Sequence, residues 1–107
     1  MSSTPHQVIG VDLGGTAIKL ARFDGRGVLL AALEQATPQP ATPGAVTVAI
    51  VEAIEQIDPD HYASLVGIGL PGPMDAAARV ARVCINLTGW EDVPLADWLE
   101  ARLDRHV

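Results

Sequence analysis

The sequence predicts an α/β fold in which three antiparallel strands are followed by a helix and a parallel strand. Short apolar runs alternate with glycine-containing turns in the first third of the chain. A proline-rich segment then leads into a long stretch whose apolar residues recur at helical spacing. A further apolar run follows this stretch, and a strand that is reached through a helix joins a sheet in parallel.

Three strands joined by tight turns are predicted first. They cover residues 8–11, 17–23 and 28–33. The first run is short and apolar, as in a strand buried on both faces, whereas in the second Ile18 and Leu20 lie on one side and Lys19 on the other. Residues 24–27 read Asp-Gly-Arg-Gly, a strong hairpin signal because glycine adopts positive φ at little cost. Strands joined in this way form an antiparallel meander.

A helix is predicted after the third strand. Residues 37–43 contain three prolines and are expected to form a loop. Thr42 can cap a helix whose first position is Pro43, and the pair Asp58-Pro59 is expected to end it. The apolar residues at helical spacing between these points are Val46, Ala49, Ile50, Ala53, Ile54 and Ile57.

The rest of the chain predicts one more strand of the sheet and a second helix. Residues 65–70 form an apolar run that stops at the sequence Pro-Gly-Pro, which cannot continue a ladder. Residues 80–83 predict a short strand, and an amphipathic helix is expected to start near Pro94. No internal repeat is visible.

Length and composition bound the class of protein. A chain of 107 residues suffices for one small domain. It has no run of about 18 apolar residues and no secretory signal at its polar start, so a membrane is not an expected partner. Cys84 is the single cysteine and cannot form an internal disulfide, which favours a cytoplasmic, reduced setting. The net charge of −6, with scattered basic residues, argues against nucleic acid as a partner.

Residues 12–16 read Asp-Leu-Gly-Gly-Thr and lie between two predicted strands. Gly14 and Gly15 let the backbone approach a ligand closely and turn its N–H groups toward it. Thr16 adds a hydroxyl donor, and Asp12 offers a carboxylate for Mg²⁺ through water. Together these parts suit a nucleotide phosphate. The spacing alone fits a plain hairpin with a solvated aspartate equally well.

Residues 8–16, with the Ile-Lys and Phe-Asp pairs that follow, resemble the first phosphate motif of the actin-like ATPases. More narrowly they resemble the ROK (repressor, open reading frame, kinase) family, and the resemblance extends over residues 8–107. It implies an incomplete ribonuclease-H-like domain, the N-terminal part of a sugar kinase. The parent enzyme would transfer the γ-phosphate of ATP, with Mg²⁺, to a hexose such as glucose. Polyphosphate is an alternative donor, because related glucokinases use it.

A second motif follows the fourth predicted strand, where residues 67–75 read Gly-Ile-Gly-Leu-Pro-Gly-Pro-Met-Asp. It contains the dinucleotide-binding pattern G-x-G-x-x-G, but its prolines prevent the helix that this pattern requires. It is similar to the ROK segment on the sugar side of the cleft, as is Asn-Leu-Thr-Gly-Trp at residues 86–90. The substrate contacts that the resemblance implies are Pro71, Gly72, Asn86 and Leu87. An amide such as that of Asn86 can donate to and accept from a sugar hydroxyl, and its alternative role is a turn residue.

No catalytic residue is expected within these 107 residues. Sugar phosphorylation needs a base that takes the proton from the attacking hydroxyl, and the resemblance implies an aspartate beyond Val107 for this role. The zinc-binding cysteine cluster of the family is likewise expected outside this segment, so residues 1–107 should be a partial N-terminal domain without activity of its own. The strand that would pair with residues 65–70 is also missing, which predicts an exposed edge and self-association.

Three other interpretations remain. ROK transcriptional regulators carry a helix-turn-helix domain ahead of the phosphate motif, whereas only seven residues precede Val8 here. A dinucleotide-dependent oxidoreductase is disfavoured by the prolines of the second motif. A small sugar-binding protein without chemistry would share the same motifs.

Overall fold

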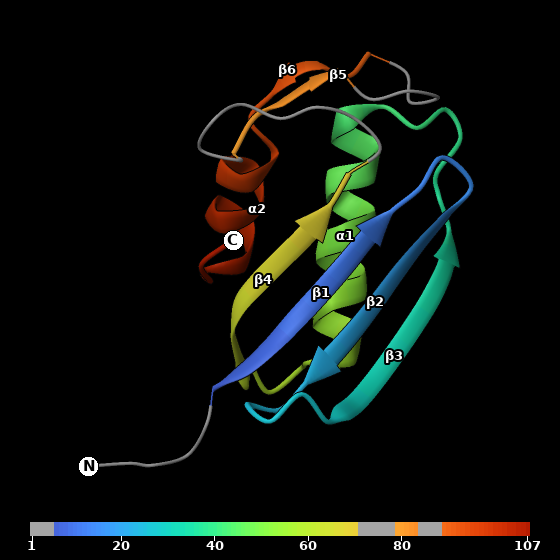
Figure 1. Cartoon of the computed structure of the whole chain (residues 1–107). Coiled ribbons are helices and arrows are strands. Elements are labelled where there is room, and N and C mark those ends of the chain that lie inside the picture. Colours follow the sequence, from blue (N-terminus) through green and yellow to red (C-terminus); the bar gives the residue numbers. More distant parts are fainter. Residues whose placement is uncertain (1–5, 71–78, 84–88) are drawn as a thin grey trace.

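A four-stranded sheet organises the computed structural model, which describes residues 6–70, 79–83 and 89–107. The sheet consists of β1 (Gln7–Leu13), β2 (Ala17–Phe23), β3 (Leu29–Ala36) and β4 (Ala63–Gly69). Its strand order is β3-β2-β1-β4, with β1, β2 and β3 antiparallel and β4 parallel to β1 (Figure 1). The predicted α/β class, and the meander with a parallel fourth strand, are confirmed.

Helix α1 (Pro43–Ile57) lies across one face of this sheet (Figure 1). The Thr42 hydroxyl oxygen accepts a hydrogen bond from the backbone N–H of Ala45 (3.3 Å), and proline occupies the first helical position. The helix ends at its C-cap Asp58. The predicted start and end of the helix are both confirmed. The sequence could predict them because the capping residues and the apolar spacing indicate the same segment.

The two faces of the sheet carry different residues. Ile9, Val11 and Leu13 of β1 are buried on the side of α1, because alternate side chains of a strand point to the same face. Gly10 and Asp12 therefore point to the opposite face, which is here called the outer face. No helix of the described chain covers the outer face (Figure 1). The core lies between the sheet and the two helices.

A small second sheet and a second helix complete the described chain. Strands β5 (Ala81–Val83) and β6 (Glu91–Val93) pair antiparallel, and α2 (Leu95–Leu103) packs against α1. The expected short strand and the helix near Pro94 are confirmed. The sequence interpretation missed β6, since two of its three residues are acidic and show no apolar run. Neither described helix is long and apolar enough to span a bilayer.

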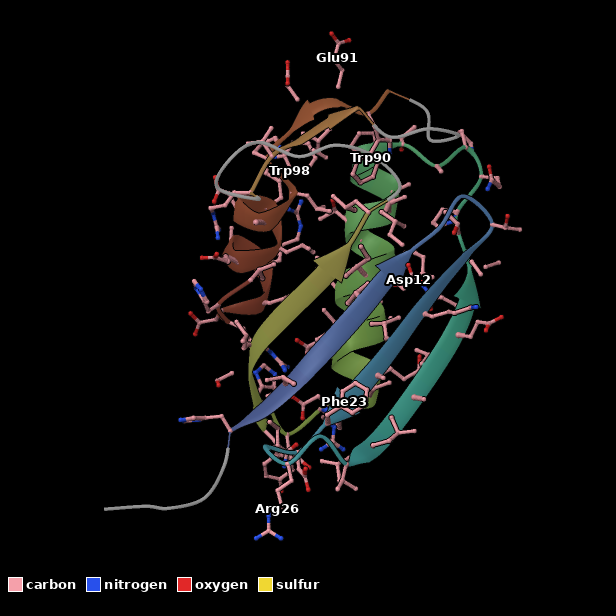
Figure 2. The ribbon with its side chains drawn as sticks, in the orientation of Figure 1. Asp12, Phe23, Arg26, Trp90, Glu91 and Trp98 are labelled. Atoms are coloured by element: carbon pink, nitrogen blue, oxygen red, sulfur yellow. The ribbon has the colours of Figure 1, made fainter. Side chains whose placement is uncertain are left out.

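Trp90 joins this small sheet to the rest of the domain. Its side chain is buried, and its Nε1 donates a hydrogen bond to the backbone carbonyl of Ala41 (2.8 Å). Figure 2 shows Trp90 at the end of α1 that is closest to β5 and β6. The carboxyl ends of β1 and β4 point toward this same end of the molecule (Figure 1).

The strands are longer than their apolar runs indicate. β3 continues to Ala36 through Glu34 and Gln35, because each of these residues still pairs with β2. The turn between β2 and β3 has the expected form: the Asp24 carboxylate accepts from the N–H of Arg26, and the neighbouring glycine adopts a positive φ. Backbone pairing, which is partly independent of hydrophobicity, sets the strand ends.

The free edge of β4 is partly covered by the C-terminal residues. Leu65 forms an isolated parallel bridge with His106. The N–H of Val66 donates to the His106 carbonyl (2.9 Å), and the N–H of His106 donates to the Ser64 carbonyl (3.3 Å). The edge that was expected to be exposed over residues 65–70 is therefore partly paired at its beginning, and the expected self-association stays a prediction.

Candidate functional site

The hairpin between β1 and β2 forms the centre of the candidate site. The N–H of Gly14 donates a hydrogen bond to the carbonyl of Ala17 (3.0 Å), which closes a tight turn. A Cβ atom placed on Gly14 would lie 3.0 Å from that same carbonyl oxygen. The turn therefore favours glycine for steric reasons, because a side chain here would force the Ala17 carbonyl to shift.

The carbonyl groups of three successive loop residues are bound by the segment that follows β3. The Oγ1 of Thr37 donates to the carbonyl of Gly14 (2.7 Å), and the N–H of Thr37 donates to the carbonyl of Thr16 (2.9 Å). The Nε2 of Gln39 donates to the carbonyl of Gly15 (3.0 Å). These bonds hold all three carbonyls toward one side of the loop.

The N–H groups of the loop consequently point to the other side. A trans peptide is planar, and its C=O and N–H point in opposite directions. The peptides whose carbonyls belong to Gly14 and Gly15 carry the N–H groups of Gly15 and Thr16. Within the described part of the chain, no acceptor contacts either of these N–H groups. Successive backbone N–H groups that point the same way form a binding site for anions.

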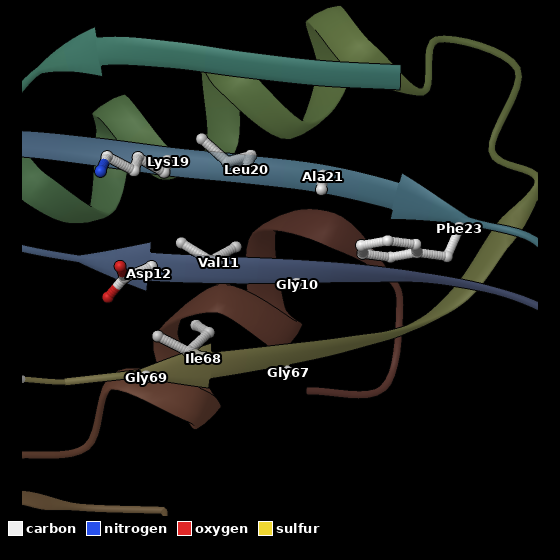
Figure 3. Close-up of a pocket in the computed structure, with 10 residues that line it drawn as sticks. All are labelled: Gly10, Val11, Asp12, Lys19, Leu20, Ala21, Phe23, Gly67, Ile68 and Gly69. Carbon is white, nitrogen blue, oxygen red and sulfur yellow. The ribbon is translucent and has the colours of Figure 1, made fainter. Parts of the chain in front are cut away.

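Asp12 lies at the end of β1, next to this loop. Its side chain is exposed on the outer face, and β-pairing places Lys19 and Gly69 beside it (Figure 3). A Cβ atom on Gly69 would lie 4.0 Å from the Asp12 Oδ1. Because Gly69 has no side chain, β4 places no side chain against the carboxylate at this position. No hydrogen bond or ion pair links the carboxylate to another described residue. It remains available to a cation.

The donor set around Asp12 fits Mg²⁺ better than a metal held by protein ligands alone. Mg²⁺ keeps several waters and binds through one or two carboxylates together with phosphate oxygens. One exposed carboxylate beside a loop that carries two unbonded N–H groups among the described residues fits that requirement. Among the described residues no three or more His, Cys, Asp or Glu side chains form a metal-binding group.

A hollow of about 540 Å³ lies on the outer face beside Asp12. Strands β1, β2 and β4 line it, with Asp12 and Lys19 toward one end and Phe23 toward the other (Figure 3). Gly10 and Gly67 pair across its floor, and a Cβ atom at either would meet nothing within 4 Å. Because these two glycines have no side chains, the space above them stays open and forms the hollow. The walls of the hollow are mainly apolar.

Of the residues expected to bind the cofactor, the structure brings all four together. Gly14, Gly15 and Thr16 form the turn after β1, and Asp12 lies near the end of that strand, next to the turn. The residues expected to contact the substrate lie outside the described residues. They are Pro71, Gly72, Asn86 and Leu87. The strands that precede them in the chain, β4 and β5, end on the side of the molecule toward which β1 also points (Figure 1).

Thr37 and Gln39 were missed by the sequence interpretation, which assigned residues 37–43 to a loop without a role. The predicted third strand ended at residue 33, whereas β3 continues to Ala36. Ala36 pairs with Ala17 in the ladder, so the next residue of the third strand must lie beside Thr16. The direction of the Thr37 side chain, however, depends on three-dimensional packing.

Comparison with known proteins gives consistent results. The ROK family profile matches residues 8–107. A glucokinase of Thermotoga maritima is 33% identical over 101 residues, which is 94% of this chain and 32% of the relative. A glucokinase of Streptomyces coelicolor is 35% identical over 95 residues, 89% of this chain and 29% of the relative.

Solved structures agree with these sequences. The ROK family glucokinase from Streptomyces griseus, in complex with glucose and AMPPNP, has a TM-score of 0.86 at 34% identity, covering 94% of this chain and 31% of that one. An inorganic polyphosphate/ATP-glucomannokinase from Arthrobacter sp. strain KM has a TM-score of 0.82 at 33% identity. The match covers 95% of this chain and 42% of that one. The chain spans about a third of the length of the curated relatives it matches. Because the family profile covers nearly the whole sequence, this chain belongs to the ROK family.

Proposed function

We propose that this chain is the N-terminal nucleotide- and sugar-binding segment of an ATP-dependent hexose kinase, with glucose as the preferred substrate to test. One observation carries the proposal. The carbonyls of Gly14, Gly15 and Thr16 are all bound by the segment after β3, which leaves the N–H groups of Gly15 and Thr16 without an acceptor among the described residues, and the exposed Asp12 lies at the end of β1 that leads into this loop. The relatives named above as glucokinases support the choice of sugar.

Each loop group has a distinct task in the proposed reaction. The N–H groups of Gly15 and Thr16, with the Thr16 hydroxyl, bind phosphate oxygens of the donor. Asp12 holds Mg²⁺ through water, and the bound ion supplies positive charge that offsets the charge on the transferred phosphoryl group. The residues of this chain thus bind and orient the donor. The base that accepts the proton of the sugar hydroxyl is proposed to lie beyond Val107.

The donor is ATP in this proposal, with polyphosphate as the alternative. A loop that reads phosphate oxygens through backbone N–H groups makes no demand on a base or a ribose. The similar Arthrobacter structure is that of a polyphosphate/ATP enzyme, which supports testing both donors.

The sugar is proposed to bind near the carboxyl ends of β1 and β4. Ligands of open α/β sheets bind outside the carboxyl ends of the strands. Pro71 and Gly72 directly follow β4 and Leu70, and Asn86 and Leu87 lie between β5 and β6 in the sequence. These four residues stay our predicted substrate contacts. A cytoplasmic location, without nucleic acid or membrane partners, also belongs to the proposal.

A phosphorylation assay on the full-length protein that carries this chain tests the proposal. The protein is incubated with Mg²⁺, ATP or polyphosphate, and a panel of hexoses that includes glucose. We expect sugar phosphate to form with at least one donor. Absence of product from every sugar with both donors would overturn the proposal.

Two carboxylate variants make the assay specific. Asp12→Asn removes the charge that holds Mg²⁺, so apparent metal affinity should fall about 10- to 100-fold. Glu34→Gln is the matched control, because Glu34 is also an exposed carboxylate of the same sheet but lies on β3. Equal losses in both variants would argue against a metal role for Asp12.

A further inference from the structure

We propose that Thr37 is the positioning residue of the phosphate loop, with Gln39 in a supporting role. This inference rests on the proposed function. Thr37 touches no phosphate in the proposed reaction. It acts through the loop, because its hydroxyl and its backbone N–H bind the carbonyls of Gly14 and Thr16. The loop N–H groups are then already oriented toward the donor before the donor arrives.

The geometry of Thr37 favours this role over a simple structural one. The residue is 3% exposed and its hydroxyl lies 2.7 Å from the Gly14 carbonyl. A buried hydroxyl has to find an acceptor, and here the acceptor is the first carbonyl of the glycine pair. The backbone N–H of the same residue binds the last of the three carbonyls, 2.9 Å away. One residue therefore holds both ends of the turn.

A loop with adjacent glycines needs such a restraint. Glycine has access to more backbone conformations than any other residue, so an unrestrained Gly14-Gly15 pair could rotate a carbonyl toward the phosphate side. A carbonyl oxygen there would repel the anion and replace an N–H donor. Donors that are fixed before binding do not have to be ordered when the ligand arrives, which improves affinity.

Gln39 adds a weaker restraint. Its Nε2 donates to the Gly15 carbonyl at 3.0 Å. The side chain is exposed, so water competes with it for this carbonyl. A hydrogen bond at an exposed position contributes less than a buried one, whose unpaired partner would lose all solvation. Thr37 is therefore expected to have the larger effect.

Two variants of Thr37 and one matched control test the inference in the full-length protein. Thr37→Val keeps the branched shape and removes the hydroxyl, whereas Thr37→Ser keeps the hydroxyl. Thr47→Val is the control. Thr47 is also buried, and its hydroxyl also donates to a backbone carbonyl at 2.7 Å, but that carbonyl belongs to Pro43 within α1. The control shows what the same chemical change does away from the loop.

The kinetic readout separates donor from sugar. We expect Thr37→Val to raise the KM for ATP about three- to tenfold, the effect of one net hydrogen bond, while the KM for the sugar stays within about twofold. Thr37→Ser should restore much of the donor affinity, and Thr47→Val should leave the KM for ATP unchanged. A Thr37→Val enzyme with unchanged donor affinity, or with equal losses for donor and sugar, would overturn the inference.

Direct binding distinguishes failure of this inference from failure of the proposed function. Titration calorimetry with tripolyphosphate and with Mg·ATP measures binding without turnover. If the protein phosphorylates no sugar but binds tripolyphosphate, and Thr37→Val weakens that binding, the kinase proposal fails and the positioning role stands. If the unaltered protein binds neither probe, both are refuted.

Discussion

The guanidinium of Arg105 and the carboxylate of Asp58 form a buried ion pair, with Nη1 and Oδ2 2.5 Å apart. The side chain of Asp58 is 0% exposed and that of Arg105 is 3% exposed. Asp58 is the C-cap of α1, and Arg105 follows α2 where the chain reaches the edge of β4. The pair therefore joins the end of one helix to the C-terminal residues.

Further hydrogen bonds satisfy most of this buried charge. The Asp58 carboxylate also accepts from the N–H groups of Tyr62 (3.0 Å) and Ala63 (2.8 Å), and Arg105 donates to the carbonyls of Asp58 and Ala63. Burial by itself would raise the pKa of Asp58. The N–H groups of Ala63 and Tyr62 and the Arg105 guanidinium outweigh burial and hold the pKa of Asp58 below its ordinary value.

Removing the charge of Asp58 should destabilise the fold strongly. Asp58→Asn removes the buried partner of the Arg105 guanidinium and leaves it only the half-exposed Glu55 carboxylate at 3.8 Å, and breaking a buried ion pair in this way costs about 3 kcal/mol. Urea denaturation of this chain and its variant measures the loss. Asp60→Asn is the control, because Asp60 is exposed and its substitution should cost less than about 0.5 kcal/mol. Similar losses in the two variants would show that the ion pair is not the cause.

The stability should depend on pH through the same group. The pKa of Asp58 is lower in the folded state than its ordinary value of 3.8, so the unfolded state binds more protons between the two pKa values. The contribution of Asp58 is thus fully present above the ordinary pKa and is lost as the pH falls through the folded pKa. The difference in unfolding free energy between the unaltered chain and Asp58→Asn should narrow below about pH 4. A difference that stays constant down to pH 2 would contradict this assignment.

Gly14 should not tolerate even alanine. The added Cβ atom would lie 3.0 Å from the Ala17 carbonyl oxygen, a backbone atom that cannot rotate away, so the turn must widen. We expect a loss of about 1–3 kcal/mol in stability and weaker binding of tripolyphosphate. Gly44→Ala is the matched control, because its Cβ atom would meet nothing within 4 Å and the residue lies in α1. That variant should be neutral or up to about 1 kcal/mol more stable. If both glycines tolerate alanine equally, the turn is looser than its geometry indicates.

Local chemistry explains which parts of the fold could be predicted from the sequence. The limits of α1 followed from Thr42 and Pro43 at its start and Asp58 at its end, because caps act within a few residues. β6 was missed, since its acidic residues are placed by the burial of the neighbouring Trp90 and by pairing with β5. Contacts between distant segments decide such elements.

The same distinction applies to the candidate site. The loop residues were predicted because glycine, threonine and aspartate act there through local properties. Thr37 and Gln39 lie 23 and 24 residues from their partners, so their roles emerge only from the register of β2 with β3. A motif thus identifies the groups that would contact a ligand, and the fold identifies the groups that hold them.

The remaining prediction concerns the edges of the sheet. Leu65 of β4 pairs with His106. From Gly67 onward, in the described part of the chain, no strand pairs with the edge of β4 that faces away from β1. An unpaired strand edge can add a strand from a second molecule, so this chain should self-associate. Sedimentation equilibrium should give a mass that rises above the monomer mass of 11.2 kDa with concentration.

Two lysine substitutions determine which edge is involved. Gly67→Lys places a charge on β4 at a position where a side chain meets nothing within 4 Å, and it should return the chain to a monomer. Ala32→Lys places the same charge on β3, the strand at the other edge of the sheet, and should leave association unchanged. If Ala32→Lys abolishes association instead, the contact runs through β3. A chain that stays monomeric at every concentration would refute self-association through either edge.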